Sequence, residues 1–134
     1  MTKFVILLAT ATGLSACAMG EPQPIRSDAM QQKYNQLLAG KTPGPTDSCL
    51  PLHRTHDMTV IDEQTLLFRD GRTVWVNNMK ASCTGLNRVG HAIVNNTFGA
   101  QLCSGDIARV VDTNTGITVG SCAYGDFMSY RPAG

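Results

Sequence analysis

The stretch Thr65–Val76, which reads TLLFRDGRTVWV, decides the fold. Two of its segments are rich in the β-branched and aromatic residues that favour strands: Thr65–Phe68 and Thr73–Val76. Between them lies Asp70-Gly71, a dipeptide typical of tight hairpin turns. Side chains alternate across a strand, so we expect Val74 and Val76 on one face of this hairpin and Trp75 on the other.

Further short segments extend this hairpin into a sheet. They are separated by polar or glycine-containing loops and have the composition of strands: Met58–Ile61, His91–Val94, Ile107–Val111 and Ile117–Ser121. The segment 91–94 is ambiguous, although nearby glycines disfavour a long helix there. We therefore expect a mainly β fold, a small antiparallel sheet of five or six strands that is curled or closed into a barrel, because closure removes exposed edges.

The residues before the sheet predict a helix and a linker. Ser27 or Asp28 can cap a short amphipathic helix over residues 27–40, whose apolar residues follow at helical spacing: Met30, Tyr34, Leu37 and Leu38. Residues 41–48, rich in proline and glycine, interrupt this pattern and indicate a linker. The β domain would then occupy residues 49–134.

The first residues predict export. Lys3 provides a positive end, and Phe4–Ala9 opens an apolar segment that is too short to span a bilayer. The motif Leu14-Ser15-Ala16-Cys17 then resembles the lipobox of bacterial lipoproteins. This resemblance implies a signal peptide over residues 1–16 and an acylated Cys17 as the first residue of the mature chain.

The alternative to lipidation is an ordinary secretory signal, cut near Ala16 or Ala18. If Cys17 is acylated, residues 17–26 form the lipid anchor and a spacer. The residue after Cys17 is Ala18 and not Asp. By resemblance to lipoprotein sorting in Gram-negative bacteria, this implies the periplasmic face of the outer membrane.

Four cysteines remain in the predicted β domain, and an even number in a small exported domain indicates disulfides. Three connectivities can join them. We favour a nested pattern that pairs Cys83 with Cys103 and Cys49 with Cys122, so that the second bridge ties the start of the domain to its last strand.

The charge of the chain argues against nucleic acid as a partner. The sequence has 11 Lys and Arg against 10 Asp and Glu, and removal of Lys3 with the signal peptide balances them. Phosphate binding needs clustered, uncompensated basic residues, and the sequence contains no long basic run.

One short segment concentrates residue types that bind metals: Cys49, His53, His56 and Asp57. No second cluster with matching spacing accompanies it, and Cys49 is expected in a disulfide. We therefore predict no metal and no cofactor, and we keep a metal-handling protein that uses His53 and His56 as an alternative.

Catalytic patterns are equally sparse. A thiol nucleophile would need an unpaired cysteine near a base such as His53 or His91, whereas the cysteines are even in number. Asp106 follows Ser104-Gly105, but neither G-x-S-x-G nor a phosphate-binding loop motif occurs. We expect no enzyme, with a small hydrolase as the alternative, using His53, His56, His91 or Asp106.

Four aromatic residues can either fill the core or form a binding surface: Trp75, Tyr124, Phe127 and Tyr130. The core is the commoner place for such residues in a small domain. Trp75 and Tyr130 remain the candidates for a binding surface. Alternatively, the tail Gly125–Arg131 forms a last edge strand, which would allow a partner to add a strand.

Several motifs run through the predicted β domain: Cys49, Val60–Phe68, Cys83–Leu86, Leu102–Asp106, Ser121-Cys122 and Gly125–Phe127. Together they resemble a family of short bacterial lipoproteins that are themselves a domain of unknown function. This resemblance implies an exported β domain with paired cysteines and supplies no catalytic residue.

The sequence as a whole predicts an outer-membrane-anchored periplasmic lipoprotein that acts as a non-enzymatic binding or envelope-structural module. Its expected partners are the membrane, through acylated Cys17, and a protein or another component of the cell envelope.

Overall fold

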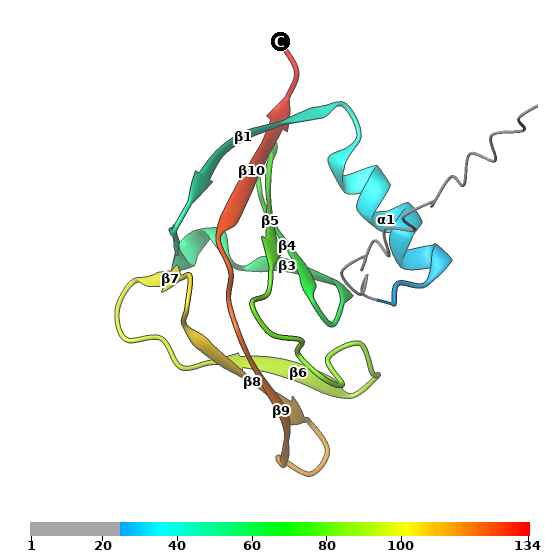
Figure 1. The fold of residues 1–134 in the computed structure, drawn as a ribbon, viewed down its shortest axis with the longest axis vertical. Coiled ribbons are helices and arrows are strands. Elements are labelled where there is room, and N and C mark those ends of the chain that lie inside the picture. The colour runs from blue at the N-terminus through cyan, green and yellow to red at the C-terminus, as the bar shows by residue number, and fades with distance from the viewer. Residues whose placement is uncertain (1–24) are drawn as a thin grey trace, which may run out of the picture.

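The structure is a computed structural model that describes residues 25–134 (Figure 1). The predicted signal peptide 1–16 and the predicted acylation site Cys17 lie outside these residues. None of the helices in the described residues combines the length and the apolar composition that a bilayer span requires.

The described chain is mainly β, as the sequence predicted, with α-helix α1 (Asp28–Leu38) before the strands. A five-stranded sheet has the order β1 (Lys41–Asp47), β10 (Phe127–Pro132), β5 (Thr73–Asn78), β4 (Thr65–Asp70) and β3 (Asp57–Asp62). A three-stranded sheet has the order β6 (His91–Asn95), β8 (Ile107–Asp112) and β9 (Thr118–Ala123). A third sheet pairs β2 (Cys49–Pro51) with β7 (Gln101–Cys103), and the 3-10 helix η1 (Leu52–Arg54) follows β2.

The strands of residues 25–134 do not close into a barrel, so the structure does not confirm that part of the prediction. All paired strands are antiparallel, and they form three separate sheets. The five-stranded sheet forms the upper part of the molecule in Figure 1, and β6, β8 and β9 form the lower part. The helix α1 lies beside the five-stranded sheet.

The predicted linker 41–48 is wrong, because residues 41–47 form β1. Pro43 and Pro45 are tolerated there because β1 is an edge strand, where a missing backbone N–H is not needed on the outer side. The register of β1 against β10 shifts between Pro43 and Thr46. The tail is also no edge strand, since β10 lies between β1 and β5.

The hairpin β4–β5 separates two apolar clusters, and its side chains alternate as predicted. Trp75 belongs to the larger cluster, which the five-stranded sheet shares with residues of the other two sheets. Val74 and Val76 face the opposite side, where Ile61 and Leu67 complete a smaller buried cluster. Four residues of α1 pack on this smaller cluster at the predicted helical spacing: Met30, Tyr34, Leu37 and Leu38.

All four cysteines of the described residues form disulfides, but the predicted connectivity is wrong. The bridges are Cys49–Cys103 and Cys83–Cys122, in place of Cys83–Cys103 and Cys49–Cys122. Cys49 and Cys103 are direct partners in the pairing of β2 with β7. Cys122 lies on β9 and is buried together with Cys83. The first bridge therefore follows strand register and the second joins a loop residue to β9, and sequence spacing alone reveals neither.

Candidate functional site

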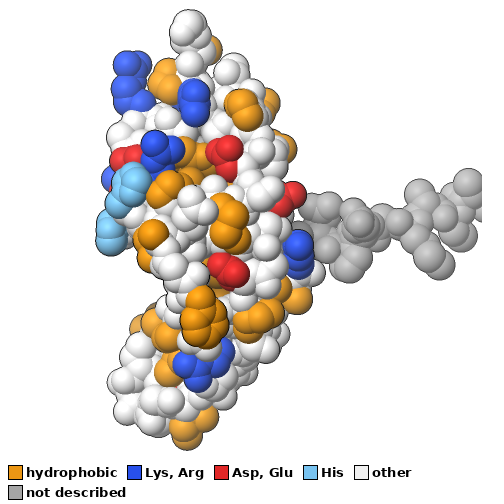
Figure 2. Space-filling model, turned by 90° about the vertical axis from the view of Figure 1, so that its left-hand side faces the viewer, with side chains coloured by type: hydrophobic (Ala, Val, Ile, Leu, Met, Phe, Trp, Pro, Cys, Tyr) orange, Lys and Arg blue, Asp and Glu red, His pale blue; other side chains and the backbone are white. Residues whose placement is uncertain are grey.

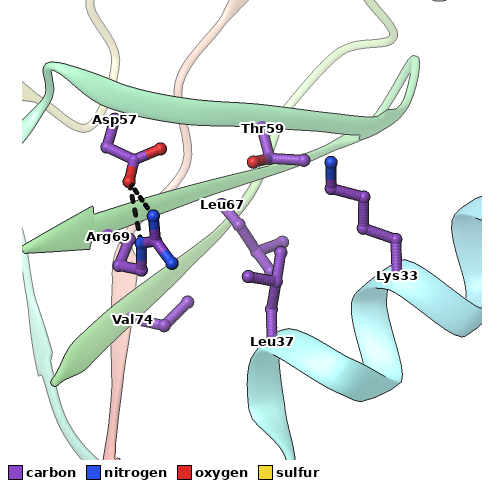
Figure 3. A pocket seen from close by; sticks show the side chains of 7 residues that line it. All are labelled: Lys33, Leu37, Asp57, Thr59, Leu67, Arg69 and Val74. Carbon is purple, nitrogen blue, oxygen red and sulfur yellow. Dashed lines mark hydrogen bonds and ion pairs between the residues drawn. The ribbon is translucent and has the colours of Figure 1, made fainter.

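A small cleft opens between α1 and the face of β3, β4 and β5 (Figure 3). Its volume is about 160 Å³, and seven residues line it: Lys33, Leu37, Asp57, Thr59, Leu67, Arg69 and Val74. Strand alternation explains this set, because Leu67 and Arg69 lie two residues apart on β4 and therefore share a face of the sheet. The helix supplies Lys33 and Leu37, which lie one turn apart.

The floor of the cleft is apolar. Leu67 and Val74 are each 1% exposed and belong to the cluster beneath α1. Leu37 is half-buried and points toward Leu67 from the helix (Figure 3). A ligand that entered the cleft would therefore meet hydrocarbon at the bottom.

Charged side chains occupy the rim. Arg69 donates a hydrogen bond from Nε to Oδ2 of Asp57 at 2.7 Å, and its Nη2 forms an ion pair with the same oxygen at 2.7 Å. These residues are directly opposite each other on β4 and β3. Lys33 is exposed and reaches over the cleft toward Thr59 (Figure 3). Among the described residues, no acidic group forms an ion pair with Lys33, so the rim carries one uncompensated positive charge.

The cleft depends on how α1 is held against the sheet. Ser27 caps the helix by accepting a hydrogen bond from the backbone N–H of Met30. Just before the cap, Arg26 donates from Nε to Oδ2 of Asp62 at 2.8 Å, and Asp62 is only 1% exposed. The Arg26 guanidinium also lies 4.6 Å from the centre of the Tyr34 ring. These contacts fix the start of the helix on the end of β3.

Tyr34 is partly shielded from water beneath the helix. Burial raises the pKa of its hydroxyl above the ordinary value, and nearby Tyr130 and Asp62 act in the same direction. The positive charge of Arg26 opposes the rise in this pKa. Tyr34 is therefore neutral at physiological pH and contributes packing area and a cation–π contact.

The segment with metal-binding residue types, Cys49 to Asp57, does not bring these side chains together around one point. His53 lies in η1 and His56 follows it, both exposed, while Cys49 is bound in a disulfide. Asp57 instead pairs with Arg69 at the rim of the cleft. In residues 25–134, no three His, Cys, Asp or Glu side chains come together as a metal site. Histidine side chains lie at the surface beside both acidic and basic groups (Figure 2).

The structure does not bring His91 and Asp106 together. His91 is the partner of Asp112 in the pairing of β6 with β8. Asp106 precedes the other end of β8, six residues away, or about 20 Å along a strand. Each has a local role: Nδ1 of His91 lies 2.8 Å from the carbonyl oxygen of Gly85, and Oδ2 of Asp106 accepts a hydrogen bond from the backbone of Cys103.

Three of the four aromatic residues fill the core, the commoner place for them, and Trp75 is therefore not part of an exposed binding surface. Trp75 is 2% exposed in the larger apolar cluster. Tyr130 is half-buried and packs against the smaller cluster beneath α1. Tyr124 and Phe127 are fully buried, with ring centroids 6.3 Å apart. Burial raises the pKa of Tyr124, whose hydroxyl donates a 2.6 Å hydrogen bond to Asn95.

Large apolar side chains are also exposed on and around the three-stranded sheet: Val89, Val94, Phe98, Ile107, Ile117 and Val119. Orange side chains are scattered over the corresponding lower part of the molecule in Figure 2. Exposed apolar residues are normal on protein surfaces, so this distribution alone does not define a site.

Sequence reasoning missed the cleft. One signal was available, because Lys33 and Leu37 are spaced i and i+4 and must share a face of the helix. The other wall depends on the register that places Asp57 opposite Arg69, and the sequence does not determine it. In comparisons with known proteins, the chain matches no family model, no curated protein and no solved structure.

Proposed function

We propose that the protein is a lipoprotein, anchored through Cys17 to the periplasmic face of the outer membrane, whose β domain is a non-enzymatic binding module. The observation that carries this proposal is the pairing of all four cysteines of the described chain. Structural disulfides form and persist in oxidising compartments such as the bacterial periplasm. The lipobox-like motif that ends at Cys17 supports the same location.

The length of the connection to the domain fits a module that acts close to a membrane. Ten residues, 18–27, separate Cys17 from the first residue of α1. A chain of this length spans at most about 35 Å when fully extended. An acyl anchor on Cys17 would therefore keep the cleft within a few nanometres of the bilayer.

The composition of the cleft supports binding. Its apolar floor and charged rim offer the two features by which small-molecule sites hold and orient a ligand. Among its seven lining residues, the carboxylate of Asp57 is engaged by Arg69, and no histidine or cysteine is present to serve as base or nucleophile. The site supports recognition better than it supports catalysis.

Radiolabelled palmitate and membrane fractionation test the proposed anchor. The protein is expressed in a Gram-negative host with its own N-terminus, beside a Cys17→Ala variant as the matched control. We expect the unaltered protein to carry the label and to sediment with outer membranes, and the variant to carry none. Unlabelled protein recovered from the soluble periplasm would overturn the anchoring proposal while leaving export intact.

A further inference from the structure

The size of the cleft limits what it can hold. Its volume of about 160 Å³ is close to that of cavities, about 150 Å³, that accept a single benzene molecule in an engineered protein core. Leu37, Leu67 and Val74 supply apolar contacts around this space. The part of a ligand that fits inside the cleft is therefore an apolar group of about six carbons.

The charge at the rim determines which end group is favoured. Arg69 and Asp57 neutralise each other as a hydrogen-bonded ion pair, which leaves the ammonium group of Lys33 as the net charge of the site. Figure 3 shows that the Lys33 side chain extends across the cleft toward β3. An anionic group above the apolar floor would meet this ammonium group, whereas a cationic group would be repelled by it.

We propose that the cleft binds a small organic anion, with an apolar body the size of a benzene ring in contact with Leu37, Leu67 and Val74 and its carboxylate at Lys33. This inference rests on the proposed binding function and names the ligand class of the same site. The Asp57–Arg69 pair forms the opposite rim, where the two residues lie directly across from each other on β3 and β4.

Three probes of the same size and different charge test the proposal: benzoate, benzyl alcohol and benzylammonium. The mature protein is purified from membranes in detergent micelles, and micelles without protein give the blank for partitioning of the probes. Methyl NMR signals of Leu37, Leu67 and Val74 report contact with the floor. We expect benzoate to shift these signals at the lowest concentration and benzylammonium at the highest.

Charge variants then test the role of the rim. Lys33→Gln should weaken benzoate binding about three- to fivefold, the effect of one exposed ion pair, and leave benzyl alcohol unchanged. Lys33→Gln combined with Arg69→Gln leaves only Asp57 charged, and it should reverse the preference in favour of benzylammonium. Lys80→Gln removes the same charge from an exposed lysine outside the cleft and should change neither affinity.

The possible failures are distinguishable. Equal affinity for the three probes, or a loss with Lys80→Gln as large as that with Lys33→Gln, would overturn the assignment of an anion. Cleft signals that respond to benzylammonium in preference to benzoate would also overturn it, while leaving a binding function in place. If no probe shifts these signals, the ligand assignment is wrong, and the anchoring proposal still stands or falls on the palmitate experiment.

Discussion

Replacement of Arg26 by alanine should destabilise the protein far more than replacement of any exposed arginine. Two guanidinium nitrogens of Arg26 each lie 2.8 Å from Oδ2 of Asp62, and Nη2 also donates to Thr65 at 3.2 Å. The side chains of Arg26 and Asp62 are 17% and 1% exposed. Arg26→Ala would leave the Asp62 carboxylate buried without its counter-charge.

The expected loss follows from this burial. Breaking a buried ion pair by removing one partner costs about 3 to 5 kcal/mol. Asp62 keeps one hydrogen bond, from the backbone N–H of Gln64, and Arg26 is not fully buried, so we expect the lower end, about 3 kcal/mol. At about 4 °C per kcal/mol for a domain of about 100 residues, Tm should fall by roughly 12 °C.

Urea unfolding and calorimetry measure this loss against two controls. Arg69→Ala breaks the ion pair with Asp57. The side chains of Arg69 and Asp57 are 55% and 49% exposed, so this substitution should lower the free energy of unfolding by no more than about 1 kcal/mol. Combining Arg26→Met with Asp62→Leu removes both charges and should recover most of the loss, because no unpaired charge stays buried. If Arg26→Ala costs no more than Arg69→Ala, the reasoning about the buried pair is refuted.

Three further predictions follow from other parts of the fold. Gly125→Ala should cost at least about 3 kcal/mol in urea unfolding, because its Cβ would overlap the backbone carbonyl oxygen of Asn78; a loss below 1 kcal/mol would contradict the close approach. Burial raises the pKa of Tyr124 above its ordinary value of 10.0, so the unfolded chain loses this proton before the folded chain does. Stability should therefore be full below about pH 10 and decline as the pH rises further, and Tyr124→Phe should flatten that decline in urea midpoints measured up to about pH 12; an unchanged slope would contradict it. Cys49–Cys103 is half-buried whereas the other disulfide is buried, so alkylation and mass spectrometry during mild reduction should detect the thiols of Cys49–Cys103 first; simultaneous reduction would argue for global opening.

The direction of side chains within one strand or helix could be predicted from the local sequence. The alternation of Val74, Trp75 and Val76 predicted that the two valines share one face and Trp75 lies on the other, as the two apolar clusters confirm. The spacing from Met30 to Leu38 likewise predicted α1 and its buried face. These predictions succeeded because side-chain direction follows from the period of a strand or a helix.

Features that depend on which strands pair were beyond local reasoning. The disulfides followed the pairing of β2 with β7 and the placement of β9, so the nested connectivity was wrong. The composition of residues 41–48 predicted a linker, whereas residues 41–47 pair with β10 as an edge strand on which prolines are tolerated.

The cleft needed the same long-range information. Its Lys33 and Leu37 wall could have been expected from helical spacing, whereas Asp57 meets Arg69 only through the register of β3 with β4. The histidines drew attention in the sequence because imidazole is chemically versatile, but chemical type carries no information about position.

Disulfide and acyl mapping of the intact protein from bacterial envelopes tests the central claim most directly, because an exported, anchored chain should carry both bridges seen in the fold and an acyl group. Non-reducing proteolysis with mass spectrometry should recover peptides joined through Cys49–Cys103 and Cys83–Cys122 and an N-terminal peptide that begins with acylated Cys17. Each bridge closes a loop, of 54 and 39 residues, whose cross-link contributes about 4 kcal/mol on chain-entropy grounds. Free thiols, the nested pairing, or an unacylated N-terminus would contradict the account.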